Sequence, residues 1–476
     1  MAEPMSATNP FLNFPFGSIQ MECEARDLIV EGEIPADLCG TLYRAGPNQR
    51  FKPRGDYHLF MGDGMVHAFH IKDGRVDYNN RWVRTNKWKH EDREGRALIN
   101  PMNPFDCDPE YTDFVFTDKD GTANTAIVWH GGRLLVMEEG HPPFELDPHT
   151  LESIGSWNFR GKLNTAMTAH PKIDPDTGEM VFFAYMATGP FSADVMVHKV
   201  NPEGILTEST LIPTPYSAMV HDFVMTENYI IIPVMPITGS LERAMEGGPP
   251  FAWEPDKGVF LGVLPRHGGK TEDVRWIEMD LGFAFHFMNA FDQDGVISID
   301  ACQFESAPLF PTANGESTPR STPHLSRWTI DMNAADPRAV FTRVDEFESE
   351  FPQCDPRYTG RPYRHGWYTS PDGELRSGAN KEEKFYNVVG HFDHKTGVAD
   401  RYSCGQAVAS EAIFVPASQE AAEGEGYLLS VVTSFETRTS SLYIFNALKV
   451  SDGPVAKVHL SHRVPAGFHG GWRPGA

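Results

Sequence analysis

The sequence predicts an all-β fold. Short apolar runs rich in valine, isoleucine, phenylalanine and tyrosine recur along the chain, and glycine, proline, aspartate and asparagine separate them. Segments with helical periodicity are scarce, and no linker or break in composition divides the 476 residues. One large β architecture, a barrel or a propeller, accounts for this pattern better than several tethered domains. We therefore expect a single domain over residues 1–476.

Seven segments carry the strand pattern most clearly. Turn signals such as DPDTGE, HKTG, PDGE and SDGP fall between strand-like runs, where hairpins need residues that adopt turn conformations. In chain order the predicted strands are RLLVMEE, MVFFAYMA, YIIIPVMP, GVISID, FYNVVGHF, YLLSVVTSF and SLYIFNAL. Short helices are expected near residues 91–99 and 240–248. Residues 246–275 and 303–325 are expected to form loops over one face, where substrate sites are common.

Charge and hydropathy exclude several classes of partner. The chain has 65 acidic and 41 basic residues, a formal charge of −24, which repels phosphate backbones and anionic headgroups, so we expect no nucleic-acid partner. No run of 18 apolar residues is present, so no transmembrane segment is predicted. Prolines interrupt the first 17 residues, which argues against a secretory signal. Six scattered cysteines without a C-x-x-C pair are typical of reduced thiols in a cytoplasmic protein.

Four histidines stand in four separate, well-marked motifs. They are His170 in TAHPKIDP, His221 in MVHDFVMT, His286 in FAFHFMNAFD and His469 in AGFHGGW. Imidazole is the most common protein ligand for a redox-active metal. If the fold brings all four together, they form an iron site with no carboxylate among its direct ligands. The usual fingerprints of esterases, zincins, nucleotide and dinucleotide sites are absent from the sequence.

A second arrangement of possible iron ligands involves a carboxylate. His391 and Asp393 in HFDHKTG lie on the same face of a predicted strand, and with His469 they would form a facial triad of two histidines and one carboxylate. The same segment also has the pattern of a strand that enters a turn. The facial triad predicts dependence on 2-oxoglutarate or another electron donor.

A resemblance to a known family extends over nearly the whole chain. The segments that carry it, in order, are VEGEIPADLCGTLYRAGPNQRF, HLFMGDGMVHAFHIKDGRVDYNNRWVRT, LDPHTLE, TAHPKIDPDTGEM, HDFVMTENYIIIPVMP, EFPQCDPRYTGRPYR, SEAIFVPAS and GFHGGW. They resemble the carotenoid cleavage oxygenases. The segment LERAMEGGPPFAWEPDKGVFLGVLPRHGG is most similar to the bacterial branch with lignostilbene dioxygenases and isoeugenol monooxygenase. The resemblance implies a seven-bladed β-propeller with a dome of loops and short helices over its iron face.

The resemblance also implies the residues of the iron site. One Fe(2+) would be bound by the four histidines, with O2 as cosubstrate. Three glutamates would accept hydrogen bonds from the outward ring nitrogens and offset the charge of the metal. They are Glu139 for His221, Glu350 for His286 and Glu411 for His469. Thr125 in TANTAIV matches a threonine whose methyl group crowds one open coordination position.

The implied reaction is scission of a C=C bond of a small hydrophobic conjugated alkene into two carbonyl products. Phenol-cleaving members bind the 4-hydroxyl of the substrate with a tyrosine and a lysine, and the matching positions here are Phe105 and Glu138. Phenylalanine offers no hydrogen bond, and a carboxylate repels a phenolate. Overall similarity favours a stilbene- or phenylpropenoid-type substrate, whereas the lost pair favours an apocarotenoid or another non-phenolic alkene. If the chain were a non-catalytic propeller, we would expect at least one of these histidines or glutamates to be lost, and none is missing. The sequence does not determine the oligomeric state.

Overall fold

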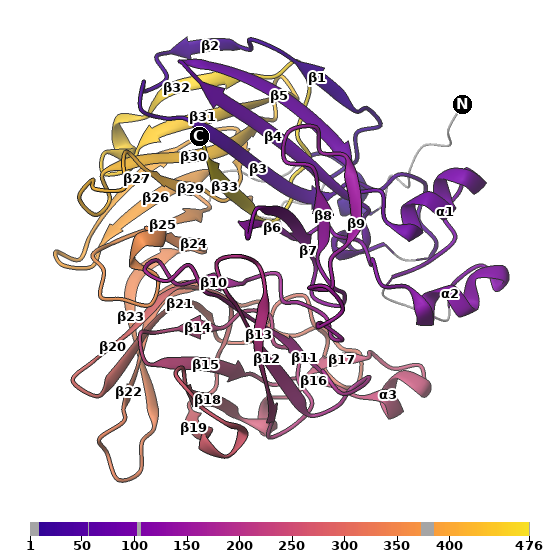
Figure 1. Cartoon of the computed structure of the whole chain (residues 1–476), viewed down its shortest axis with the longest axis vertical. Coiled ribbons are helices and arrows are strands. Elements are labelled where there is room, and N and C mark those ends of the chain that lie inside the picture. Colours follow the sequence, from indigo (N-terminus) through magenta and orange to yellow (C-terminus); the bar gives the residue numbers. More distant parts are fainter. Residues whose placement is uncertain (1–8, 56, 102–105, 373–384, 476) are drawn as a thin grey trace. The chain divides into compact units, whose positions relative to one another are not determined.

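The computed structural model describes residues 9–55, 57–101, 106–372 and 385–475. Within them strands dominate (Figure 1). Nearly all of the described strand pairs are antiparallel, and β19 with β23 is a parallel exception. The fold class is therefore all-β, as predicted. The chain divides into two compact units, each built from segments far apart in the sequence. Unit 1 comprises Met1–Ala169, Asp372–Val389 and Tyr402–Ala476, and unit 2 comprises His170–Pro371 and Gly390–Arg401.

Three sheets lie in the described part of unit 1. The first has the strand order β1 (Cys23–Ala25), β5 (Arg75–Trp82), β4 (Gly64–Lys72), β3 (Gly40–Pro47) and β33 (Gly470–Pro474). The second has the order β2 (Ile29–Gly32), β32 (Pro454–His459), β31 (Ser440–Asn446), β30 (Gly426–Ser434) and β28 (Ala407–Ala409), with β29 (Ile413–Pro416) also on β30. The third is β6 (Ala126–His130), β7 (Arg133–Met137), β8 (Phe144–Leu146) and β9 (Ser153–Ser156).

Unit 2 contains a four-stranded, a two-stranded and an eight-stranded sheet among its described residues. The first is β10 (Lys172–Ile173), β11 (Met180–Tyr185), β12 (Asp194–Val200) and β13 (Leu206–Pro213), and the second is β16 (Ile237–Gly239) and β17 (Phe251–Trp253). The third has the order β14 (Val224–Met225), β15 (Tyr229–Val234), β18 (Val259–Pro265), β19 (Arg275–Met279), β23 (Ala339–Glu348), β22 (His324–Asp331), β21 (Val296–Phe304) and β20 (Phe283–Gln293).

One further sheet has residues in both units. Its order is β24 (Glu350–Cys354), β25 (His365–Ser370), β26 (Val388–Asp393) and β27 (Val398–Ser403). In the eight-stranded sheet, β19 and β23 are joined by a single parallel pair, Met279 and Ala339. Because this pair merges two groups of four strands, the described sheets do not show seven separate blades.

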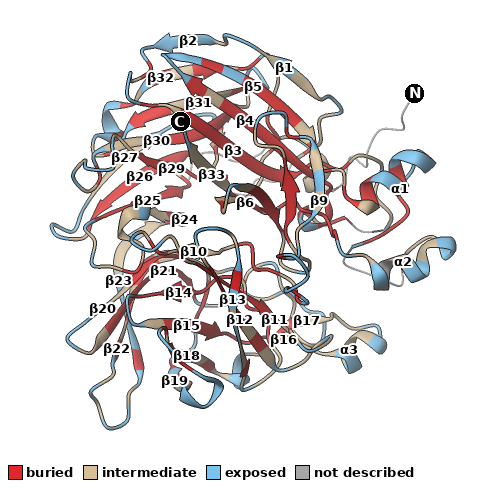
Figure 2. Cartoon of the chain, in the orientation of Figure 1, coloured by how far each residue is buried: buried red, intermediate tan, exposed pale blue. Residues whose placement is uncertain are grey.

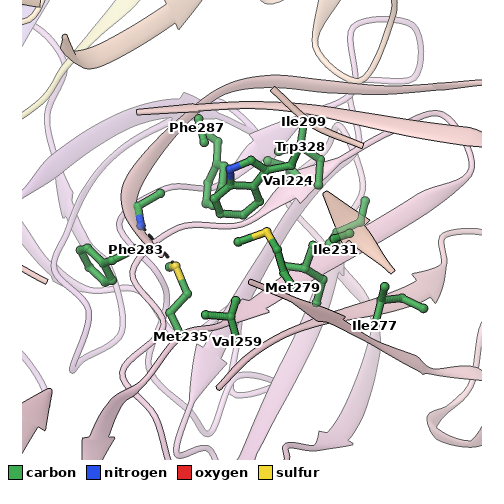
Figure 3. Packing of buried hydrophobic residues seen from close by; sticks show 14 of the residues in the cluster. Val224, Ile231, Met235, Val259, Ile277, Met279, Phe283, Phe287, Ile299 and Trp328 are labelled. Atoms are coloured by element: carbon green, nitrogen blue, oxygen red, sulfur yellow. Dashed lines mark hydrogen bonds between the residues drawn. The ribbon is translucent and has the colours of Figure 1, made fainter. Parts of the chain in front are cut away.

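The largest core of unit 2 fills the space between the strands of the eight-stranded sheet and its neighbours (Figure 3). Phe283, Met235 and Trp328 pack there at 5% exposure or less, and the backbone N–H of Ala284 donates to the sulfur of Met235 over 3.2 Å. Figure 2 shows how burial differs between strands: β15 and β21 are largely buried, whereas β23 has mostly exposed and intermediate residues. The buried strands β15 and β21 coincide with two of the predicted apolar runs.

The short helices differ in part from the prediction. The helix α1 spans Asn86–Glu94 rather than 91–99, because Thr85 caps its start by accepting from the N–H of Trp88 and Gly95, at φ 70°, ends it. The helix α3 (Leu241–Met245) lies where it was expected. Helix α2 (Thr112–Thr117) was not predicted. No helix in the described ranges is both long and apolar enough to cross a membrane.

The two predicted loop regions have different outcomes. Residues 246–275 are only partly irregular, because β17 and β18 run through them, so this prediction was wrong in part. Residues 305–323 hold no named strand, in agreement with the expected loop at 303–325, and isolated bridges such as Pro311 with Ser317 hold the segment. All seven predicted strand segments contain a strand. They correspond to β7, β11, β15, β21, β26, β30 and β31.

Candidate metal centre

Three of the four predicted histidines belong to unit 2, and the fold brings them together there. His170 precedes β10, His221 precedes β14, and His286 lies within β20. Each of these strands is at the edge of its sheet, so one side of its backbone has no neighbouring strand in that sheet. The three rings meet edge to face, with centroids 4.6 to 5.0 Å apart.

The ring nitrogens of these histidines have the spacing of metal ligands. His170 Nε2 lies 3.0 Å from His221 Nε2, which lies 3.2 Å from His286 Nε2. All ligand atoms of the three side chains lie within 4.8 Å of one another. Imidazole nitrogens bind a metal at about 2.1 Å, so neighbouring ligands of an octahedral ion are about 3.0 Å apart. The three histidines of unit 2 therefore fit a single metal ion.

A buried carboxylate fixes the ring of His286. Its Nδ1 donates to Oε2 of Glu350 over 2.6 Å, and Glu350 is only 3% exposed. The hydrogen bond keeps the ring proton on Nδ1, so the Nε2 lone pair is available to a metal. The pairing of β20 with β21 shifts in register between Ala284 and Phe287. Such irregularities change the direction in which side chains point, and here the shift spans His286.

His469 and its carboxylate partner lie together in unit 1. His469 Nδ1 donates to Oε1 of Glu411 over 3.0 Å, and the N–H of Gly470 donates to Oε2 over 2.8 Å. The Arg44 guanidinium lies 3.4 Å from the same Oε2, with both side chains buried. Burial raises the pKa of Glu411, but His469, Arg44 and the Gly470 N–H outweigh it and lower the pKa to about 2. Glu411 is therefore a carboxylate at neutral pH.

The structure places Thr125 beside the backbone of His469. The His469 N–H donates to the carbonyl oxygen of Thr125 over 3.1 Å, and the Thr125 hydroxyl donates to the side chain of Asn124 over 2.9 Å. Glu139 follows β7 in unit 1 and is partly buried. Its predicted contact with His221 stays a prediction. Phe105 lies outside the described residues.

Glu138 contacts a histidine that sequence reasoning missed. Its carboxylate accepts from the Thr122 hydroxyl over 2.7 Å and pairs with Nδ1 of His141. Burial raises the pKa of Glu138, but His141 and then Thr122 hold it below its usual value. Burial lowers the pKa of His141, but Glu138 raises it to about 9. The spacing E-x-x-H in EEGH was the only sequence signal for this pair.

Gly121 makes the close approach of this pair possible. Its φ is +60°, and an added Cβ would overlap both the Glu138 carboxylate and the His141 ring. The position therefore requires glycine on grounds of both backbone and space. The carboxylate–imidazolium pair has no net charge, so the surroundings of Glu138 are less negative than its sequence position indicated.

We expect the Glu138–His141 pair to stabilise the fold between about pH 5 and 8. The raised pKa of His141 adds stability that is complete below its ordinary pKa of 6.5 and is lost as the pH rises through about 9. The lowered pKa of Glu138 adds stability that is present above 4.5 and is lost in acid.

Chemical denaturation of wild type and Glu138→Gln at pH 6 and pH 10 measures this contribution. The difference in unfolding free energy should be roughly 1–3 kcal/mol at pH 6, because both side chains are partly exposed and solvent screens the pair. It should largely disappear at pH 10, where His141 has lost its charge. An equal difference at both values would contradict an ion pair.

Other contacts occupy the alternative His391–Asp393 site. Asp393 accepts from Nε and Nη2 of Arg364 over 2.9 and 2.7 Å and from the N–H of Lys395 in the following turn. His391 Nε2 lies 2.9 Å from Nδ1 of His365. These contacts favour the interpretation of the segment as a strand that enters a turn.

Comparisons with known proteins agree with these features. A family model described as retinal pigment epithelial membrane protein matches residues 16–474. The lignostilbene-alpha,beta-dioxygenase isozyme III of Sphingomonas paucimobilis is 38% identical over 95% of both chains. The isoeugenol monooxygenase of Pseudomonas nitroreducens is 37% identical over 96% of both. The crystal structure of Pseudomonas brassicacearum lignostilbene dioxygenase matches all of both chains with a TM-score of 0.94 at 35% identity. The chain therefore belongs to the carotenoid cleavage oxygenase family and is an alkene-cleaving oxygenase with a propeller-like fold.

Proposed function

We propose that the chain is a non-haem Fe(II) enzyme that uses O2 to cleave a C=C bond of a small conjugated alkene into two carbonyl products. The observation that carries this proposal is the convergence of Nε2 atoms from His170, His221 and His286 at 3.0 and 3.2 Å. We assign His469 as the fourth ligand. Glu411 supports this assignment, because it holds the Nδ1 proton of His469 as Glu350 holds that of His286.

In this proposal the protein offsets the charge of the metal and restricts the position at which O2 can bind. Four neutral imidazoles leave the full charge of Fe(II), and Glu139, Glu350 and Glu411 would offset it from behind the ligands. Bound iron would supply the electron that makes O2 reactive. The Thr125 methyl group would crowd one open position and direct O2 to the other, close to the alkene. Cleavage of the alkene by O2 into two carbonyl products balances in atoms and electrons, so the reaction needs no reducing cosubstrate.

The favoured substrate is a stilbene- or phenylpropenoid-type alkene. Its support is the similarity over the whole chain to a lignostilbene dioxygenase and an isoeugenol monooxygenase. The His141 imidazolium adds support, because it balances the Glu138 carboxylate that would otherwise repel a phenolate. An apocarotenoid or another non-phenolic alkene is the alternative, favoured by Phe105 and Glu138 at the phenol-binding positions.

Iron analysis and a substrate panel test the proposal together. Protein expressed aerobically with added iron should bind iron stoichiometrically and cleave a member of a panel of resveratrol, a methoxylated stilbene, isoeugenol and an apocarotenal. Mass spectrometry identifies the aldehydes. Turnover with O2 and no 2-oxoglutarate would separate this centre from a facial triad. Protein without iron or products would support a non-catalytic propeller instead.

Restoring the phenol-binding pair should raise activity on 4-hydroxystilbenes. The double variant Phe105→Tyr and Glu138→Lys gains a hydroxyl donor and a cation, and a hydrogen bond to a charged group is worth roughly tenfold or more in kcat/KM. Comparing resveratrol with its methyl ether isolates the contribution of the 4-hydroxyl. The matched control is Glu138→Gln, which removes the carboxylate without adding a cation. An equal gain on the ether would mean that the two positions do not contact the hydroxyl.

We also infer a single domain with seven blades, in a cytoplasmic protein. Separating the eight-stranded sheet at the single Met279–Ala339 pair would give two four-stranded blades, and five other sheets have four strands or more. The segments of the two units alternate along the chain, which supports one domain. The six cysteines are free thiols, as is usual in a reducing compartment.

A further inference from the structure

A buried carboxylate connects the three histidine segments of unit 2. Asp222 follows His221 directly and is 2% exposed. Its Oδ1 lies 2.8 Å from Nζ of Lys172, which stands two residues after His170. Its Oδ2 accepts from the backbone N–H of Phe287, the residue after His286, over 3.1 Å. A single side chain thus contacts the neighbours of all three histidines.

The strands that follow His170 and His221 are short, and the strand that contains His286 is irregularly paired. The strands β10 and β14 are each two residues long, and β20 is irregular in register on both sides of Phe287. Short edge strands and irregular pairing leave the backbone few ladder hydrogen bonds that fix its position. Asp222 supplies the N–H of Phe287 with a buried acceptor at this irregular point.

Asp222 is also held firmly in its own segment. The N–H of Phe223 donates to Oδ1 over 2.8 Å, and the Lys172 ammonium that balances its charge lies 5.8 Å from the centre of the Phe223 ring. A buried carboxylate with a cation and two N–H donors has few alternative positions. A displacement of any one segment would break a hydrogen bond of this carboxylate.

We propose that Asp222 is a positioning residue that sets the distances between the rings of His170, His221 and His286. The inference rests on the proposed metal site, because it concerns how the ligand set is held before the metal binds. A preorganised set binds an ion more tightly than one that must be ordered during binding. Lys172 assists by balancing the charge of the carboxylate, which keeps Asp222 buried at the junction.

The test measures metal affinity and site geometry rather than turnover. Fe(II) dissociation constants are obtained by competition with a chelator, and the spectrum of the Fe(II)–nitric oxide adduct reports the symmetry of the ligand set. Asp222→Ala should weaken Fe(II) binding about 10- to 100-fold and give a broadened or multi-component spectrum. Asp222→Asn, which retains an acceptor for one N–H, should recover part of both.

A matched variant separates positioning from general stability. Asp300 is equally buried in unit 2, and its side chain accepts from the guanidinium of Arg327 and from the hydroxyl of Tyr363, neither of which adjoins one of the three histidines. Asp300→Asn should lower the melting temperature of iron-free protein yet leave Fe(II) affinity and the nitric oxide spectrum unchanged.

The outcomes distinguish the two proposals. If wild type binds Fe(II) and Asp222→Ala binds it with the same affinity and the same spectrum, the positioning role is wrong and the metal site stands. If Asp222→Ala and Asp300→Asn lose affinity in proportion to their lost stability, Asp222 acts only through the fold, and the role is again wrong. If wild type itself binds neither Fe(II) nor Co(II), the metal site fails and the positioning role fails with it.

Discussion

Replacing His221 with alanine is expected to abolish stoichiometric iron binding while leaving the fold intact. His221 lies outside the named strands and is only partly buried, so its loss removes no strand hydrogen bond. Its Nε2 lies 3.0 Å from Nε2 of His170 and 3.2 Å from Nε2 of His286. Loss of this proposed ligand should weaken Fe(II) binding by more than roughly 100-fold, which exceeds the effect of losing a residue that only hydrogen-bonds to a ligand.

His198→Ala is the matched control for this prediction. His198 is a fully buried histidine of β12 in unit 2, stacked on Phe182 and 2.8 Å from the Ser209 hydroxyl. Its replacement should destabilise the protein by about 2–4 kcal/mol because it leaves a cavity, yet preserve iron binding. Melting temperatures must be compared without metal, since a bound ion stabilises the folded state. Retained iron and activity in His221→Ala would contradict the proposed centre.

Local sequence pattern predicted the strands because burial and turn chemistry are local properties. YIIIPVMP forms β15, whose residues after Tyr229 are all buried. The same approach missed β18 within residues 246–275, where the surrounding glycines and prolines indicated a loop. It placed α1 too late, because the charged run EDREG was more conspicuous than the cap at Thr85. Boundaries thus depended on single capping residues that the periodicity did not show.

The candidate site was predictable in its residue types but not in its geometry. The motifs around the four histidines carried the family resemblance, and the resemblance named Glu350 and Glu411. The register shift beside His286 depends on pairing between β20 and β21, which no local pattern encodes. Asp222 joins segments 65 residues apart through its contact with Phe287. Such contacts arise only when the sheets assemble, so the sequence alone did not reveal them.

Glu350 and Glu411, which accept hydrogen bonds from His286 and His469, should contribute differently to stability when their charge is removed. Glu350→Gln should cost about 1 kcal/mol of stability, because the described residues provide no lysine or arginine that pairs with Glu350. Glu411→Gln should cost about 3–5 kcal/mol, because it leaves the buried Arg44 guanidinium without its carboxylate. Both variants should weaken Fe(II) binding about 10- to 100-fold.

The pH dependence of the stability lost in Glu411→Gln tests whether the charge of Glu411 causes that loss. The pKa of Glu411 is lowered to about 2, so its contribution to stability is complete above the ordinary value of 4.5 and is lost as the pH falls toward 2. The difference in unfolding free energy between wild type and variant should therefore be constant from pH 5 to 8 and shrink in acid. A difference that persists at pH 2 would contradict a charge-based role.

A second substitution at Arg44 separates folding from metal binding at Glu411. The double variant Arg44→Met and Glu411→Gln removes both buried charges, so it should recover most of the stability that Glu411→Gln alone loses. It should not recover Fe(II) affinity, because His469 still lacks the carboxylate that its Nδ1 contacts at 3.0 Å. If chelator competition shows that affinity returns together with stability, Glu411 acts on the metal only through the fold. If stability returns alone, the carboxylate has two separable roles: it balances Arg44 in the core and orients His469 for the metal.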